Sequence, residues 1–285
     1  MEEILTFLEA QFSDIFAEKG DEESFRLLES TRDEALTRAE EEFFLTAILQ
    51  EIQTRPTQRL LLFDLGGSPL LGSRLLSSLP NPSSVGYVRL DPNPASLVAS
   101  RKLLASSGVS HRLLLADPAL ASLQDADWHY IKSQADACIV LLGGCSWNAF
   151  LDRHQLCIDS FMRGSSLSLV SLLTLERLPY MLKRLQAVKA KGALFDTMRA
   201  RAVIFEGGSL LYKKEVSWPL LAKPPRLPAI TGYYELGVAI SEGPTFPLAN
   251  IFSLDYLQEE LFSGFHFRPG PSAGEGQLFS LRFTH

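Results

Sequence analysis

The stretch that decides the fold is residues 60–73, which read LLLFDLGGSPLLGS. The apolar run Leu60 to Asp64 predicts a strand buried on both faces, because such a strand shows no alternation of polar and apolar residues. Residues 66–69, Gly-Gly-Ser-Pro, then predict a tight turn into a helix, since glycine tolerates unusual backbone angles and proline suits the first helical position. The stretch therefore indicates the strand-turn-helix unit of an α/β protein.

Outward from this unit, short apolar runs alternate with helical patterns as far as residue 173. Alternation of this kind predicts parallel strands joined by crossover helices, so we expect a doubly wound, mostly parallel, Rossmann-like sheet. The predicted strands are Leu60 to Asp64, Val85 to Asp91, Arg112 to Ala116, Ala137 to Leu142 and Leu167 to Leu173, with helices at Pro94 to Ser106 and Arg153 to Phe161.

Three further parts flank this core. The chain is predicted to divide into an acidic helical cap (1–55), the core (56–175), an insertion or lid with partly antiparallel strands (176–253), and a closing helix and β-hairpin (254–285). In the cap, Ile4, Leu8 and Phe12 recur at helical spacing. Beyond the core, the patterns predict a helix at Glu176 to Val188, strands at Ala202 to Phe205, Leu210 to Trp218 and Tyr233 to Ile240, a helix at Leu254 to Phe262, a strand from Phe265, a Pro/Gly/Ser-rich turn, and a strand at Leu278 to Phe283.

The composition is that of a soluble globular protein, with 46% hydrophobic and 21% charged residues. The start MEEILTFLEA lacks the basic residues of a secretory signal, and no apolar run approaches the roughly 18–20 residues of a membrane span. Three cysteines without a CxxC pair and five histidines without ligand spacing indicate neither a disulfide framework nor a metal site. We therefore expect a cytoplasmic protein that holds no metal and contacts no membrane.

Charge is unevenly distributed along the chain, whose net charge is −6. Residues 1–50 carry 14 acidic against 4 basic side chains, whereas residues 176–226 carry 11 basic against 4 acidic ones. The basic segment is either a solvated face or an attraction for an anionic substrate, and a pI near 5.5 disfavours a nucleic-acid partner. For the acidic helices three interpretations stay open: covering a sheet edge, capping a pocket, or pairing in a homodimer.

Ligands of doubly wound sheets bind at the carboxyl ends of the strands, so the residues there form the candidate site. Asp64 ends the first strand, and the glycines after it let a ligand approach the backbone and the free N–H groups of the following helix. Asp91 ends the second strand, where a carboxylate suits both hydroxyls of a ribose. The remaining candidates are Gly66, Gly67, Ser68, Pro92, Asn93, Asp117, Gly143 and Gly144. Because G-x-G-x-x-G is missing from the first loop, NAD is disfavoured.

This order of strand ends resembles class I S-adenosylmethionine-dependent methyltransferases over residues 60–173, and the tail from Leu261 resembles their last helix and antiparallel terminal hairpin. The resemblance implies the Rossmann-like methyltransferase fold and S-adenosylmethionine as cofactor. It places Asp64 to Ser68 at the methionine end of the cofactor, Asp91 at the ribose and Asp117 at the adenine amino group. The chain departs from the family pattern D-x-G-x-G-x-G, with Ser68 and Leu70 where glycines are usual.

Two narrower resemblances concern single segments. Residues 66–73 and 90–94 are similar to nicotianamine synthases, which transfer an aminocarboxypropyl group from the same cofactor, although the long insertion departs from them. Leu142 to Phe150 is loosely similar to a loop of histidine-specific methyltransferases. The Asn/Asp-Pro-Pro-aromatic stretch of methyltransferases that act on planar amino groups is missing, which disfavours adenine and glutamine as acceptors.

The sequence therefore predicts methyl transfer to a small-molecule acceptor. The alternatives are aminocarboxypropyl transfer and a non-catalytic protein that keeps the fold as a scaffold. No catalytic base is assigned; the candidates for substrate contact are Trp147, Asn148, Tyr233 and Tyr234. We also expect Asp91 to contribute more cofactor affinity than any other side chain, and its removal to cost little stability if its carboxylate faces an open crevice.

Overall fold

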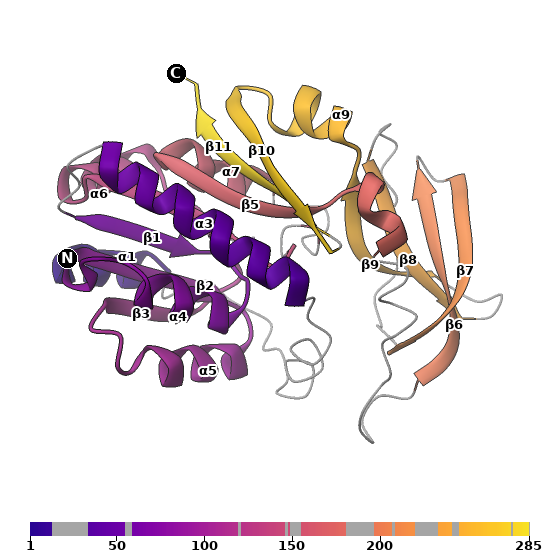
Figure 1. Cartoon of the computed structure of the whole chain (residues 1–285), viewed down its shortest axis with the longest axis horizontal. Coiled ribbons are helices and arrows are strands. Elements are labelled where there is room, and N and C mark those ends of the chain that lie inside the picture. Colours follow the sequence, from indigo (N-terminus) through magenta and orange to yellow (C-terminus); the bar gives the residue numbers. More distant parts are fainter. Residues whose placement is uncertain are drawn as a thin grey trace.

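The sheet at the centre of the molecule has the strand order of a doubly wound fold. A computed structural model describes residues 1–12, 34–54, 59–118, 121–145, 148, 155–180, 197–206, 209–219, 233–240, 245–274 and 276–284, with the backbone alone at 155–159, 197–206, 209–219, 233, 235–240 and 245–249. The sheet has seven strands in the order β10-β11-β5-β4-β1-β2-β3 (Figure 1). Its strands are β1 (Leu60–Asp64), β2 (Val85–Asp91), β3 (Ser110–Leu115), β4 (Ala137–Leu142), β5 (Leu167–Leu173), β10 (Phe265–Ala273) and β11 (Gly276–Phe283).

The first five strands are parallel and follow the order 3-2-1-4-5, whereas β11 runs antiparallel to β5 and pairs with β10 in a terminal hairpin. The order 3-2-1-4-5 is that of the Rossmann fold. The predicted fold class, a doubly wound, mostly parallel sheet with a terminal β-hairpin, is therefore confirmed.

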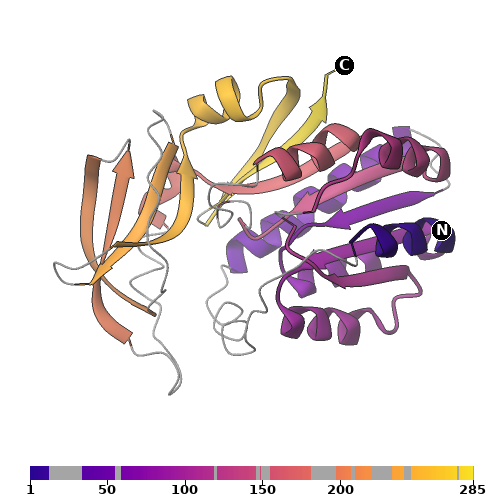
Figure 2. The ribbon, with the colours of Figure 1, turned by 180° about the vertical axis from the view of Figure 1, so that it is seen from behind.

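Helices cover both faces of this sheet (Figures 1 and 2). One face carries α1 (Glu2–Phe12), α6 (Asp125–Gln134) and α7 (Gln155–Gly164), and the other carries α3 (Glu34–Thr54), α4 (Pro69–Ser77) and α5 (Pro94–Leu104). Alternate residues of each strand serve the two faces, so that Leu61 and Phe63 pack toward α6 and α7, and Leu62 packs toward α3 and α4. Because both faces are covered, β1, β2, β4 and β5 are buried along their whole length.

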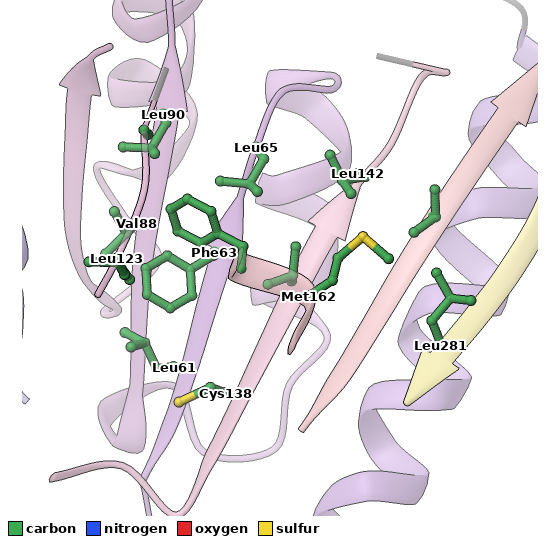
Figure 3. Packing of buried hydrophobic residues seen from close by; sticks show 14 of the residues in the cluster. Leu61, Phe63, Leu65, Val88, Leu90, Leu123, Cys138, Leu142, Met162 and Leu281 are labelled. Atoms are coloured by element: carbon green, nitrogen blue, oxygen red, sulfur yellow. The ribbon is translucent and has the colours of Figure 1, made fainter. Parts of the chain in front are cut away.

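Aromatic rings form the centre of the α6/α7 face. Phe63 contacts both Trp128 and Phe161 edge to face, with ring centroids 5.8 and 5.4 Å apart. Phe12 of α1 stacks on Phe161 at 6.0 Å and joins the N-terminal helix to this core. Figure 3 shows Phe63 among Leu61, Leu65, Val88 and the other aliphatic side chains that surround the rings.

The acidic helices at the N-terminus pair with arginines of the core. Arg112 of β3 binds Glu2 and Glu9 of α1, Arg74 of α4 binds Glu41 of α3 at 2.9 Å, and Arg282 of β11 binds Glu51 of α3. Helix α1 thereby covers the edge strand β3, and α3 crosses β10 and β11. Several acidic side chains of residues 1–50 thus form ion pairs within one chain. Pairing of these helices in a homodimer stays a prediction.

A second, antiparallel sheet forms the insertion between β5 and the terminal hairpin (Figure 1). Its order is β7-β6-β8-β9, with β6 (Thr197–Glu206), β7 (Ser209–Pro219), β8 (Tyr233–Ile240) and β9 (Thr245–Phe252). A bridge between Thr174 and Phe252 joins it to the carboxyl end of β5. The sequence patterns indicated three of these strands and missed β9.

Several boundaries differ from those predicted; β6, for example, begins at Thr197 rather than at Ala202. β3 begins two residues earlier and ends one residue earlier. The Pro/Gly/Ser-rich segment is not a turn but part of β10, with a bulge between Pro269 and Ser272. The predicted closing helix is α9 (Leu254–Tyr256) followed by the π-helix η4 (Leu257–Leu261).

Short 3₁₀ turns complete the described part of the chain, η1 (Pro82–Ser84) and η3 (Leu175–Arg177). Most of the predicted helix Glu176 to Val188 lies outside the described residues. None of the helices in the described ranges combines the length and the apolar composition that a membrane span needs.

The aromatic cluster predicts a large effect of a single substitution. Phe161→Ala should lower the free energy of unfolding by about 3–5 kcal/mol, because it leaves a cavity among Phe12, Phe63 and Trp128. Urea denaturation measures the change. Phe267→Ala, which removes a half-buried ring of β10, is the control and should cost clearly less. Equal losses in both variants would contradict the central place of Phe161.

Candidate functional site at the strand ends

The loop after β1 is a strand-to-helix turn that depends on two glycines. Gly66 and Gly67 have φ angles of 95° and 136°, a region that residues with a Cβ rarely adopt. Ser68 then caps α4, its Oγ accepting the backbone N–H of Leu70 at 3.1 Å, and Pro69 follows at the first position of the helix. Ser68 and Pro69 are buried.

The loop after β4 lies directly against this turn. A Cβ built on Gly67 would lie 3.5 Å from the Cα of Gly143, at van der Waals distance, so the two loops lie close together. Gly144 and Cys145 continue the β4 loop with φ angles of 66° and 53°. The structure therefore brings together the glycines of two strand ends that lie about 75 residues apart in sequence, as expected where parallel strands end at one edge of a sheet.

Between the ends of β1 and β2 lies a buried ionic cluster of Asp64, Arg89 and Asp91. The guanidinium of Arg89 is fully buried; it donates to Oδ2 of Asp64 at 2.6 Å and to Oδ2 of Asp91 at 2.6 Å. It also donates to the carbonyl oxygen of Gly67 at 2.8 Å. One side chain of β2 thus holds both strand-end carboxylates and the glycine turn.

Tyr87 completes this cluster from the same face of β2. Its hydroxyl donates to Oδ2 of Asp64 at 2.5 Å. Burial, together with the nearby Asp64 carboxylate, raises the pKa of Tyr87 well above its ordinary value, so the hydroxyl keeps its proton and remains a donor. Burial also raises the pKa of Asp64, and the charge of Arg89 and the hydrogen bond from Tyr87 offset part of this effect.

The guanidinium of Arg89 remains charged in this setting. Burial alone would lower its pKa, but Asp64, Tyr87 and Asp91 together raise it above its ordinary value. With both carboxylates ionised the cluster therefore carries a net charge of −1, which favours a cationic ligand group nearby.

Asp91 is more enclosed than its place at a strand end predicts. Its Oδ1 accepts the backbone N–H of Asn93 at 2.8 Å, and its Oδ2 accepts Arg89 and the Ser96 hydroxyl, both at 2.6 Å. Only 10% of the side chain is exposed. The carboxylate therefore does not face an open crevice. The expectation that its removal costs little stability depended on such a crevice and does not apply.

The neighbouring candidates lie beside Asp91. Asn93 caps α5, its Oδ1 accepting the N–H groups of Ala95 and Ser96. Asp117 is half-buried just after β3, where the N–H of Ala116 donates to the carbonyl oxygen of Asp91 and joins the two strand ends. The structure thus collects Asp64, Gly67, Asp91, Asp117 and Gly143 at the carboxyl edge of the sheet, and their roles toward a cofactor stay predictions.

The candidates for substrate contact have different surroundings. The amide of Asn148 is buried; it donates to the carbonyl oxygens of Leu173 and Asn250 and accepts the N–H of Leu173. It therefore joins β5 to the inserted sheet. Tyr234 is half-buried in β8, the side chain of Tyr233 is not described, and Trp147 lies outside the described residues. A contact of any of the four with a substrate stays a prediction.

Two residues of this region, Arg89 and Glu40, were not among the candidates predicted from the sequence. Glu40 of α3 is buried, and its Oε1 accepts the N–H of Gly144 and the hydroxyl of Ser171, each at 2.5 Å. The Ser171 hydroxyl in turn accepts the N–H of Cys145 at 3.0 Å. Arg89 could have been found from the pattern, since a charged residue in an apolar strand, two positions before Asp91, must share a face with it.

Comparison with known proteins gives distant similarities only. No protein-family model and no curated protein sequence matches the chain. Among solved structures, a SAM-dependent methyltransferase from Anabaena variabilis is 14% identical with a TM-score of 0.46, covering 95% of this chain and 98% of that one. The PH0226 protein from Pyrococcus horikoshii is 12% identical with a TM-score of 0.46, covering 84% of this chain and 88% of that one.

A SAM-dependent methyltransferase from Bacteroides fragilis, solved in complex with S-adenosyl-L-homocysteine, is 11% identical with a TM-score of 0.40, covering 86% of this chain and 77% of that one. At these values none of the three similarities identifies the activity of this chain. The class of protein is defined by its own sheet: a doubly wound α/β protein with its candidate site at the carboxyl ends of β1, β2 and β4.

The enclosure of Asp91 predicts a structural cost for its removal. Asp91→Ala should lower the free energy of unfolding by about 1–3 kcal/mol, the range for buried donors left without a partner. The larger loss of about 3–5 kcal/mol for an isolated buried charge is not expected, because Asp64 still pairs with Arg89. Urea denaturation compares it with Asp136→Ala, which removes an exposed carboxylate that pairs with Arg59 just before β4 and should cost less because its partners face water. No difference between the two variants would contradict the network.

Gly72 tests the packing of Tyr87 against α4. A Cβ at Gly72 would lie 2.4 Å from the Tyr87 hydroxyl oxygen, so Gly72→Ala should cost about 1–3 kcal/mol although alanine favours helix. Tyr87→Phe removes that oxygen, and the double variant should lose less than the sum of the two single variants. Ser77→Ala, on the exposed side of α4, is the control. Additive losses in the cycle would contradict this contact.

Proposed function

We propose that this protein binds S-adenosylmethionine at the carboxyl ends of β1, β2 and β4 and transfers its methyl group to a small-molecule acceptor. The observation that carries the proposal is the pair of acidic strand ends, Asp64 and Asp91, beside a turn of positive-φ glycines. In a doubly wound sheet this is the place where nucleotide ligands bind, with a glycine turn for close approach and an acidic residue for the ribose.

The residues at the strand ends fit such a cofactor. Among the described residues, Oδ1 of Asp64 takes part in no hydrogen bond, and Oδ1 of Asp91 accepts only one. These oxygens offer acceptor positions for the ammonium group of the methionine end and for a ribose hydroxyl, respectively. The net negative charge of the ionic cluster also suits a ligand that carries a cationic sulfonium and a cationic ammonium group.

The chemistry asks little of the side chains beyond alignment. S-adenosylmethionine supplies an activated methyl group on its sulfonium, and the displacement gains chiefly from orientation and the exclusion of water. In the proposal, the glycine turn and Asp91 fix the cofactor, Asp117 contacts its adenine, and Tyr234 and the rest of the insertion lie toward the acceptor.

A small-molecule acceptor is supported by the place of the inserted sheet. Two of its attachments, the Thr174–Phe252 bridge and the hydrogen bond from Asn148 to Asn250, lie at the carboxyl end of β5. This is the same edge of the main sheet that carries the candidate site. An insertion anchored there is suited to covering a compact acceptor.

A non-catalytic binding protein is the second candidate. It is favoured by Arg89, whose bonds to Asp64 and Asp91 already satisfy one oxygen of each carboxylate. Aminocarboxypropyl transfer from the same cofactor is the third candidate. The reaction products distinguish the three candidates. S-adenosylhomocysteine indicates methyl transfer, 5′-methylthioadenosine indicates aminocarboxypropyl transfer, and binding without either product indicates a binding protein.

Calorimetric titration with S-adenosylmethionine and S-adenosylhomocysteine tests the cofactor. We expect one-to-one binding of both by the wild-type protein. Gly67→Ala should weaken binding at least about tenfold, because a Cβ at this positive φ strains the turn that the cofactor is proposed to approach. Gly108→Ala, which also places alanine at a positive φ but in the loop before β3, should bind as the wild type does. A folded protein that binds neither ligand at millimolar concentration would overturn the proposal.

A further inference from the structure

We infer that Asp91 recognises a single ribose hydroxyl, through Oδ1, and that Arg89 and Ser96 are the positioning residues that impose this limit. The inference rests on the proposed function, since it specifies how the same strand-end site distinguishes nucleosides. It differs from the sequence-based expectation, in which one carboxylate accepts both hydroxyls of the ribose.

The limit follows from counting acceptor positions. Each carboxylate oxygen has two lone pairs, so Asp91 can accept four hydrogen bonds. Oδ2 uses both of its positions, one for Arg89 and one for the Ser96 hydroxyl, each at 2.6 Å. Oδ1 uses one position for the N–H of Asn93 at 2.8 Å. One position on Oδ1 therefore remains for a ligand, and it accommodates one hydroxyl group.

A ligand is not expected to displace the donors on Oδ2. Arg89 is fully buried and Ser96 is 3% exposed, so neither side chain can turn to water if it loses Asp91. The same guanidinium nitrogen also donates to the carbonyl oxygen of Gly67, and a movement of Arg89 would release the glycine turn as well. Exchanging the guanidinium of Arg89 for a neutral hydroxyl would give up an attraction between opposite charges, and a displaced Ser96 hydroxyl would be left buried without an acceptor for its proton.

Asn93 is equally fixed. Its N–H bonds Oδ1 of Asp91 while its own side chain caps α5. Rotation of the Asp91 carboxylate to offer a second position would therefore break the bond from the backbone N–H of Asn93. The predicted consequence is a site that requires one ribose hydroxyl and tolerates the loss of the other.

The experiment compares S-adenosylhomocysteine with its 2′-deoxy and 3′-deoxy derivatives by calorimetry on the wild-type protein. We expect one derivative to bind within about threefold of S-adenosylhomocysteine and the other about 10- to 100-fold more weakly, the loss of one charge-assisted hydrogen bond. If both derivatives lose tenfold or more, or if neither does, the inference is overturned. Failure of S-adenosylhomocysteine itself to bind would instead overturn the proposed function.

Two variants of Ser96 test the positioning role. Ser96→Ala vacates a position on Oδ2, and the difference between the two deoxy derivatives should narrow to about threefold or less. Ser96→Thr keeps a hydroxyl and should retain the wild-type difference. A merely structural role of Ser96 would lower the affinity for all three ligands by a common factor and leave their ratios unchanged, which would overturn the assignment. Melting temperatures of both variants confirm that the folded state is being compared.

Discussion

The buried guanidinium of Arg89 is the group on which the arrangement of the strand ends depends. It is fully enclosed and lies between two carboxylates, one at the end of β1 and one at the end of β2. Removing a charge from water is costly, and this cost is recovered only when partners surround the charge in good geometry. The side chains of Asp64, Asp91 and Ser96 and the carbonyl of Gly67 provide that geometry, so their positions are linked to one another.

A third carboxylate reaches the carboxyl ends of the strands from outside the core. Glu40 of α3 binds the N–H of Gly144 and, through Ser171, is connected to that of Cys145. The loop after β4 has left-handed backbone angles at both residues, and these bonds stabilise them. The loops after β1 and β4 are thus each held by a buried charged side chain, one from β2 and one from an N-terminal helix.

The sequence was most informative where burial alone decides the structure. The apolar runs of β1, β2, β4 and β5 matched the observed bounds, because strands covered on both faces contain little else. It failed where proline lies at a sheet edge: Pro247 in β9 and Pro269 in β10 look like loop residues, but an edge strand tolerates proline because one side of it forms no ladder. The bonds of Arg89 and Glu40 could not be predicted, since they depend on the register of Asp64 beside Arg89 and on a contact across 131 residues.

The packing of α3 against β10 and β11 has a consequence for the order of events during synthesis. Glu51 and Arg282 lie 231 residues apart, and Phe43 of α3 packs on Gly270 of β10. At translation rates of 5–20 residues per second, α3 waits on the order of 10–50 s before the hairpin that covers it has been made. Contacts this distant in sequence also slow folding. The helix that shields the finished sheet therefore spends this interval without the hairpin against which part of it packs.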